Sequence, residues 1–271
     1  MNQANLGLNG ENKMINLVNK FGKFSIPTIA LFLTPMMASA ATNLSETDYV
    51  GISFWIVSIA MVAATVFFLM EANKAEAGWS TSLTVAALVT LVAAVHYFYM
   101  RGVWVDTQAS PTVFRYVDWL LTVPLQIVEF YLILAAIAVV AVSVFWRLLI
   151  ASVVMLVAGY VGEISGAGGS YLWSGFIVGM IAWLYIIYEI FAGEASKISA
   201  SKGTAASKKA FNALRWIVTI GWAIYPIGYY LGYTGSADAG TLNLIYNLAD
   251  FVNKIAFGVV IWAAATSGSK A

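Results

Sequence analysis

Two ionisable side chains one helical turn apart, Asp250 and Lys254, interrupt an apolar segment near the C-terminus of this sequence. Residues four apart lie on one face of a helix, so the carboxylate and the amine would be neighbours. An amine shielded from water is more easily kept neutral, which makes it nucleophilic toward an aldehyde and able to form a Schiff base. A protonated Schiff base needs a counterion, and the carboxylate of Asp250 could be one.

A second polar group interrupts the apolar segment 112–139. At about 100° per residue, Thr122, Gln126 and Glu129 lie within about 80° of Asp118 around a helix, so the four make one polar stripe. Glu129 lies about 16 Å beyond Asp118 along the helix axis. The stripe therefore places two carboxyl groups at different depths on one face.

Arg115, one turn before Asp118, completes a charge balance. A protonated Schiff base and Arg115 would carry two positive charges, against two negative charges on Asp118 and Asp250. Such a neutral group can be buried at tolerable cost. The alternative interpretation is a set of buried ion pairs that only fixes helix packing.

The composition shows why these charges are informative. Only 10% of the 271 residues are charged and 61% are hydrophobic, whereas soluble domains have roughly 25% and 45–50%. The formal charge of +1 excludes a nucleic-acid-binding protein. Zero cysteines and a single histidine leave no cysteine or histidine-rich metal site. We therefore expect a membrane protein without a metal centre, and not an enzyme.

Long apolar segments follow residue 42, and each is apolar around most of its circumference, which is typical of a helix surrounded by lipid or by other helices. They predict an all-α membrane protein, a bundle of seven transmembrane helices formed by residues 41–271. An ionisable residue inside such a span costs about 2.5–3.5 kcal/mol on insertion scales and is functional by default. The predicted spans are 49–70, 79–100, 112–139, 145–162, 169–192, 212–233 and 241–266.

The N-terminal segment 1–40 has the features of a cleavable signal peptide. Three lysines precede a short apolar stretch, 26–37, which leads into Ala38-Ser39-Ala40, a small-x-small cleavage pattern. An extra membrane helix is the alternative, but about a dozen apolar residues with two prolines are too short to cross about 30 Å of hydrocarbon.

The distribution of Lys and Arg predicts the orientation, because cytoplasmic connections carry the excess of these residues. They fall mainly at alternate connections and at the C-terminus, whereas the opposite connections hold little more than Arg101. We expect an inner-membrane protein with its N-terminus outside and its C-terminus in the cytoplasm. The Lys/Ser/Ala segment 195–210 is predicted to be a long, flexible inner loop.

Three motifs in separate spans resemble the microbial rhodopsins, and more narrowly the proteorhodopsins: Arg115–Leu125 (RYVDWLLTVPL), Trp222-x-x-Tyr225-Pro226 and Asp250–Lys254 (DFVNK). The similarity extends over all seven spans. It implies a bundle that encloses retinal, all-trans in the dark and bound to Lys254 as a Schiff base. It also implies that Asp118 is the primary proton acceptor and Asp250 the second counterion. The residues it places around retinal are Trp119, Gln126, Trp183, Trp222, Tyr225 and Pro226.

The resemblance further implies a light-driven outward proton pump. The pattern Asp118, Thr122, Glu129 matches the outward proton pumps of the family, with Glu129 as the cytoplasmic proton donor. Gln126 stands where blue-absorbing proteorhodopsins have Gln, and His96 stands at the histidine that forms a hydrogen bond with the acceptor. The family also suggests a homo-oligomer, a pentamer or hexamer.

Two other functions remain open at this stage: a photosensor that signals through a partner protein, and a seven-helix transporter without photochemistry. A sensor has no need of a fast donor such as Glu129. The outer ends of the last two helices offer Asp238 but no pair of glutamates. We therefore do not expect the dedicated proton-release pair found in bacteriorhodopsin.

Overall fold

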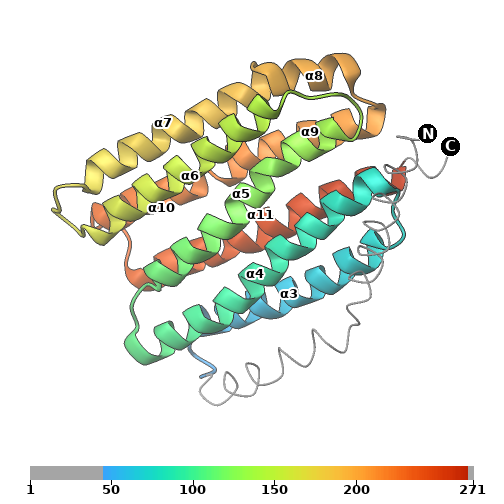
Figure 1. Cartoon of the computed structure of the whole chain (residues 1–271). Helices are drawn as coiled ribbons and strands as arrows, with labels where there is room; N and C mark the ends of the chain where they lie inside the picture. Colours follow the sequence, from blue (N-terminus) through green and yellow to red (C-terminus); the bar gives the residue numbers. More distant parts are fainter. Residues whose placement is uncertain (1–44, 268–271) are drawn as a thin grey trace, which may run out of the picture. The chain divides into compact units, whose positions relative to one another are not determined.

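The computed structural model describes residues 45–267, and within this range the chain is helical and contains no strand. The predicted signal peptide, residues 1–40, lies outside the described residues. Figure 1 labels the helices, whose bounds are α3 (Tyr49–Ala72), α4 (Ala77–Thr107), α5 (Thr112–Ala135), α6 (Val142–Ile164), α7 (Leu172–Phe191), α8 (Glu194–Lys202), α9 (Ala205–Trp216), α10 (Ile224–Tyr233) and α11 (Ala239–Ser267).

These helices form one bundle, in which α3 to α7 each pack against the next and α11 packs against α3, α4, α9 and α10. A π-helical segment, Ile217–Gly221, joins α9 to α10, so the two together make the sixth long helix. Apart from the nine-residue helix α8, which follows α7, the bundle thus has seven long helices within the described residues, which confirms the predicted fold class. Several boundaries differ from the predicted ones, and one of these differences changes the place of a charged residue: α4 continues to Thr107, so Arg101 lies buried inside this helix and not in a connection.

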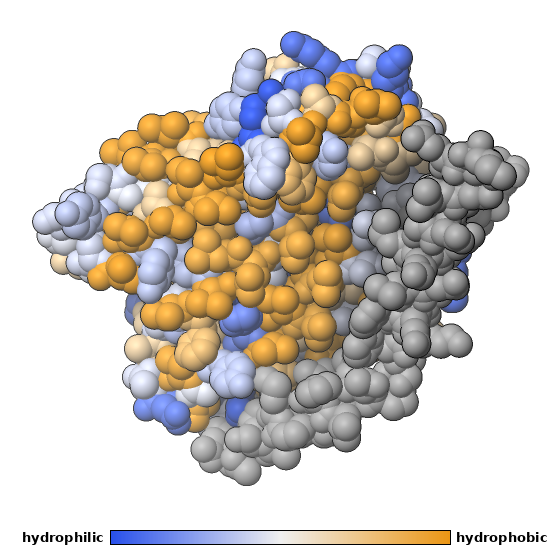
Figure 2. All heavy atoms as spheres, in the orientation of Figure 1, coloured by the Kyte–Doolittle hydropathy of each residue, from blue (hydrophilic) through white to orange (hydrophobic). Residues whose placement is uncertain are grey.

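The outside of the bundle is apolar, as a lipid environment requires. Six helices are long and apolar enough to cross a membrane among the described residues. Large apolar side chains on their outer faces, such as Trp146, Ile181 and Leu248, are more than half exposed. Figure 2 shows hydrophobic residues over most of the middle of the visible face and hydrophilic residues gathered mainly toward its borders.

The sixth helix is interrupted because of Pro226. Proline has no N–H, and its ring clashes with the carbonyl four residues earlier, so an α-helix cannot run through it undisturbed. The π-helical segment ends at Gly221, just before that point. Two side chains supply hydrogen bonds: Asn253 Nδ2 donates to Gly221 O (2.9 Å) and Trp183 Nε1 donates to Val218 O (3.0 Å). The interruption is therefore built into the bundle.

The segment 195–210 is helical where the sequence suggests a flexible loop. Helix α8 ends at Lys202, and α9 begins at Ala205. Ala and Lys favour helix, and Glu194 in the first turn and Lys202 in the last turn of α8 complement the helix dipole. The side chain of Thr204 accepts a hydrogen bond from Ser207 N (3.1 Å), which caps α9. Only two residues, 203 and 204, connect the two helices.

Helices α6 and α7 approach each other closely at glycine. A Cβ added at Gly175 would lie 2.5 Å from Ala158 O and 2.8 Å from Gly162 Cα. These neighbours are backbone atoms, so they cannot move aside without shifting the helix. By contrast, a Cβ added at Gly102 in α4 would meet no atom within 4 Å.

We therefore expect Gly175→Ala to lower the free energy of unfolding by about 1–3 kcal/mol, the usual cost of overpacking. Gly102→Ala is the matched control and should be neutral or slightly stabilising, because alanine favours helix. Thermal denaturation of both purified variants measures the difference. Equal midpoints for the two variants would contradict the close approach of α6 and α7.

Candidate functional site

A buried lysine lies between two buried carboxylates in the middle of the bundle. Lys254 Nζ, from α11, donates hydrogen bonds to Asp250 Oδ2 (2.9 Å) on its own helix and to Asp118 Oδ2 on α5. All three side chains are at most 3% exposed. The structure therefore brings together the amine and both carboxylates that the sequence singles out, and joins α5 to α11 through them.

The two carboxylates differ in their other hydrogen bonds. Asp250 Oδ2 also accepts from Tyr97 OH (2.9 Å), and Asp250 Oδ1 accepts from Tyr225 OH (2.6 Å) and Trp119 Nε1 (3.3 Å). Asp118 Oδ1 has no hydrogen-bond partner among the described residues. Asp250 is thus surrounded by donors that suit a carboxylate, while one oxygen of Asp118 remains open to accept a proton.

Arg115 makes no ion pair with these carboxylates within 4.0 Å in the described part of the chain. Its Nη2 donates to Asn243 Oδ1 (2.8 Å) and Asn247 Oδ1 (3.3 Å), and its guanidinium lies 5.1 Å from the centre of the Tyr246 ring. The charge balance inferred from the sequence therefore acts at longer range than a direct ion pair.

The two asparagines were not predicted from the sequence, although their spacing along α11 is a signal for them. Asn243, Asn247, Asp250 and Lys254 follow one another at spacings of four, three and four residues, which places them on one face of α11. All four are buried. This polar stripe on α11 is the counterpart of the stripe on α5.

His96 and Thr122 lie next to Asp118 but do not hydrogen-bond to its carboxylate. His96 Nδ1 is 4.0 Å from Asp118 Oδ1, because it makes its hydrogen bond with Val92 O (2.8 Å) one turn earlier in α4. Thr122 Oγ1 donates to the backbone carbonyl of Asp118 (3.0 Å). The direct hydrogen bond expected between His96 and Asp118 is therefore not formed.

Glu129 is buried farther along α5, at 1% exposure, and is separate from the cluster around Lys254. Neither carboxylate oxygen of Glu129 makes a hydrogen bond to a described residue, and the hydroxyl of Ser82 on α4 faces this carboxyl group. Burial among apolar groups disfavours the charged form of a carboxyl.

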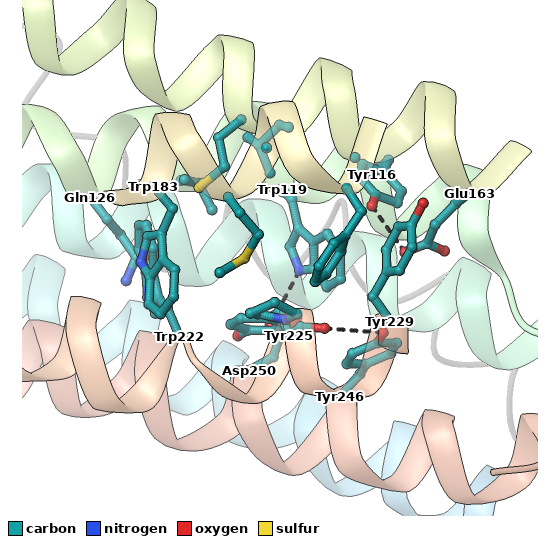
Figure 3. Close-up of a pocket in the computed structure, with 18 of the residues that line it drawn as sticks. Tyr116, Trp119, Gln126, Glu163, Trp183, Trp222, Tyr225, Tyr229, Tyr246 and Asp250 are labelled. Atoms are coloured by element: carbon teal, nitrogen blue, oxygen red, sulfur yellow. Dashed lines mark hydrogen bonds between the residues drawn. The ribbon is translucent and has the colours of Figure 1, made fainter. Parts of the chain in front are cut away.

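A cavity of about 770 Å³, including the part open to the outside, extends from Lys254 through the bundle. Figure 3 shows aromatic side chains along its walls, with Gln126, Trp183 and Trp222 toward one end and Tyr116, Glu163 and Tyr229 toward the other. The residues singled out from the sequence all line it: Trp119, Gln126, Trp183, Trp222, Tyr225, Pro226 and Lys254.

The cavity suits an elongated apolar aldehyde such as retinal. Its walls are mainly aromatic and apolar, and it has one primary amine, Lys254 Nζ, that could bind an aldehyde covalently. Gln126 Nε2 is buried in the wall without a hydrogen-bond partner among the described residues. A polar atom left unpaired is costly unless a bound group or water faces it.

Several lining residues were not predicted from the sequence. Tyr116 lies inside the motif on α5, and its hydroxyl donates to Glu163 Oε1 of α6 (2.9 Å). Glu163 itself lies near the end of an apolar helix, where a charged residue is ordinarily expected in a connection and not in a cavity. The other missed residues are Val123, Met155, Leu156, Gly159, Phe176, Gly179, Met180, Tyr229 and Tyr246.

Comparison with known proteins gives consistent matches over the same part of the chain. Residues 48–268 match the family model described as bacteriorhodopsin-like protein. A green-light absorbing proteorhodopsin from Gamma-proteobacterium EBAC31A08 is 54% identical, with 87% of this chain and 94% of the relative covered. A blue-light absorbing proteorhodopsin from Gamma-proteobacterium Hot 75m4 is 52% identical, over 92% of this chain and 98% of the relative.

Among solved structures, the blue light-absorbing proteorhodopsin from Med12 superimposes with a TM-score of 0.70 at 57% identity. The superposition covers 82% of this chain and all of the other. The chain is about equally similar to green-absorbing and blue-absorbing relatives, so overall identity does not decide the wavelength at which it would absorb.

Proposed function

Because the chain belongs to the bacteriorhodopsin-like family, we propose that it is a light-driven outward proton pump. One observation supports this function above all: Lys254 lies between Asp118 and Asp250, while a further buried carboxyl, Glu129, lies deeper along α5. With carboxyl groups at two depths on one helix, one group can accept a proton from Lys254 and the other can supply a proton to it from the opposite side. A pump needs both.

We propose that the cavity holds retinal in contact with Trp119, Trp183, Trp222, Tyr225 and Pro226. When bound, all-trans in the dark and joined to Lys254 Nζ with loss of one water, retinal supplies light absorption and an isomerisation that reorients the Nζ–H bond. The hydrogen bonds of Trp119 to Asp250 and of Trp183 to Val218 O fix the two indoles. These hydrogen bonds would hold both indole rings in position while the bound ligand changes shape.

In the proposed cycle, Lys254 Nζ gives its proton to Asp118, whose Oδ1 has no other hydrogen bond among the described residues. Asp250 keeps its charge, because Tyr97, Tyr225 and Trp119 hydrogen-bond to it. Glu129, protonated in the dark in its apolar setting, then returns a proton to Nζ and is refilled from its own side. Each exported proton stores about 2.3 kcal/mol per 100 mV of membrane potential.

The direction of transport follows from the orientation, which we propose from the lysines. Lys74, Lys197, Lys202 and Lys208 lie at the same end of the bundle as Glu129, and the excess of positive residues marks the cytoplasmic side. Asp118 then faces the extracellular half. Cleavage after residue 40, insertion in the inner membrane and assembly into a pentamer or hexamer complete the proposal.

Lys254→Ala should abolish light-driven acidification of the medium by cells that express the protein with retinal, because no other amine lines the cavity in the described part of the chain. Lys202→Ala, an exposed lysine at the end of α8, is the control and should acidify normally. A pH electrode in an illuminated suspension records both. Normal acidification by Lys254→Ala would disprove the proposal, and a slow photocycle without proton movement in the unaltered protein would favour a sensor.

Glu129→Gln should slow the return of the proton to Lys254 Nζ by on the order of a hundredfold, the usual contribution of a positioned acid. The first transfer, to Asp118, should keep its rate. Flash photolysis follows both steps through the rise and decay of the blue-shifted absorbance. Glu76→Gln, at an exposed glutamate before α4, is the control; an unaltered decay in Glu129→Gln would remove Glu129 as the donor.

We further propose that Gln126 tunes the absorption toward the blue. Its amide is buried in the cavity wall with Nε2 unpaired among the described residues, so its dipole would act directly on a bound polyene and widen the gap between ground and excited states. Gln126→Leu should therefore move the visible maximum to longer wavelength. An absorption spectrum of each purified protein with retinal tests this, and an unmoved maximum would contradict it.

A further inference from the structure

Arg115 is held beside the cluster around Lys254 by neutral groups alone in the described part of the chain. Its Nη2 donates hydrogen bonds to Asn243 Oδ1 (2.8 Å) and Asn247 Oδ1 (3.3 Å) on α11. Its Nε and Nη1 make no hydrogen bond with a described residue. Arg115 and the two asparagines are at most 2% exposed. The place of a full buried charge therefore depends on two amide oxygens.

The two asparagines lie at different depths, and Asn247 is the inner one. It precedes Asp250 by three residues and Asn243 precedes it by seven, which is about 4.5 Å and about 10.5 Å along the helix axis. Side chains in a helix point back toward its first residue. Arg115 lies one turn before Asp118, so its side chain points farther from that carboxylate, toward Asn243. The hydrogen bond to Asn243 thus draws the guanidinium away from both aspartates.

The amide of Asn247 can present only its oxygen to Arg115. Its Nδ2 donates to Ser53 Oγ on α3 (2.8 Å), and the hydroxyl of Ser53 donates in turn to Val50 O (2.7 Å). Because the hydroxyl proton is used in this way, Ser53 Oγ accepts from the asparagine and cannot donate to it. An amide turned the other way would place two donors face to face. Helix α3 therefore fixes the orientation of the inner acceptor.

Aromatic rings enclose the guanidinium from the sides. Its central carbon lies 5.1 Å from the centre of the Tyr246 ring, 5.8 Å from that of Phe54 and 6.0 Å from that of Trp119. All three rings belong to buried residues. A change in the hydrogen bonds would therefore move the charge mainly along the helix axis, between the depths of Asn243 and Asn247.

We propose that Asn243 and Asn247 are positioning residues for Arg115, and that the balance between them sets the pH range in which the pump can work. The inference rests on the proposed function. Asp118 can accept a proton only while it is ionised. The outer amide holds the positive charge far from Asp118, and the inner amide holds it nearer. The two asparagines therefore decide down to which pH Asp118 stays able to accept.

The charge of Arg115 acts on Asp118 in two ways that have the same sign. A closer positive charge favours the ionised carboxylate directly. Arg115 also acts on Asp250 and offsets its negative charge, which otherwise disfavours a second carboxylate beside it. None of the other groups that act on Asp118 is hydrogen-bonded to either asparagine, so a change at an asparagine reaches Asp118 through Arg115. Among the described residues these groups are Lys254 and Asp250 on α11, His96 and Tyr97 on α4, and Tyr225 on α10.

The test is a pH titration of the visible absorption maximum of the purified protein with retinal, because the maximum moves when Asp118 loses its charge. Leucine has the branched shape of asparagine but offers no acceptor. Asn243→Leu leaves Nη2 only the inner oxygen, so the midpoint should fall by about half a pH unit for a movement of ~2 Å toward Asp118. Asn247→Leu leaves only the outer oxygen, so the midpoint should rise. Asn212→Leu, at an exposed residue of α9, is the matched control and should not shift it.

Ser53→Ala is a milder variant, because it removes only the hydroxyl that orients the amide of Asn247. Its midpoint should rise, by less than in Asn247→Leu. A second readout needs no retinal: nitrogen-15 NMR of the Arg115 guanidinium, whose two Nη atoms should differ because only Nη2 has acceptors. The signals of this residue are those absent from Arg115→Lys. In Asn243→Leu the signal of Nη2 should move toward that of Nη1.

A merely structural role of the asparagines would not shift the midpoint in opposite directions. Shifts of the same sign in Asn243→Leu and Asn247→Leu, or no shift in either, would overturn the proposal. If a leucine variant binds no retinal, Ser53→Ala and the NMR comparison decide instead, and an unmoved midpoint with an unchanged Nη2 signal would refute it. A failure of the proposed function is distinct, because the unaltered protein then does not acidify the medium in the light, whatever the midpoints are.

Discussion

The burial of one ammonium group governs the arrangement of the bundle. Removing a charge from water costs several kcal/mol unless oppositely charged groups and hydrogen bonds surround it. Lys254 meets this condition with one carboxylate from its own helix and one from α5, Asp250 and Asp118. Helices α5 and α11, which are far apart in the sequence, must therefore pack so that the Asp118 side chain can reach Lys254 Nζ. The aromatic side chains that line the cavity lie around this cluster of one lysine and two aspartates.

The two counterions have different surroundings, and this difference is as important as their proximity. Three donors from α4, α5 and α10 bind Asp250 in addition to Lys254, so a change of its charge would disturb three helices at once. Asp118 is bound at one oxygen only among the described residues. Asp118 can therefore accept a proton with little rearrangement of the surrounding helices. Asp118 is thus the aspartate suited to change its charge, while Asp250 is the one that holds the helices together.

Much of this site could be predicted from the sequence, because charges inside apolar helices are few and their spacing fixes the face on which they lie. Asp118, Asp250 and Lys254 were found in this way. The extension of α4 past residue 100 was not predicted. A charged residue that follows an apolar segment indicates a connection, and only the structure shows that Arg101 is buried. Glu163 was missed for a different reason: only the contact with Tyr116, 47 positions away, brings it into the cavity.

The interruption in the sixth helix decides which side chains reach the cavity. A π-helical turn accommodates one residue more than an α-helical turn. If Ile217–Gly221 became a regular α-helix without losing a residue, everything beyond it would turn by about 100° relative to α9. Tyr225 and Pro226 would then leave the wall, and Asn253 would lose the carbonyl that it binds. The length of this segment is therefore constrained more tightly than its composition.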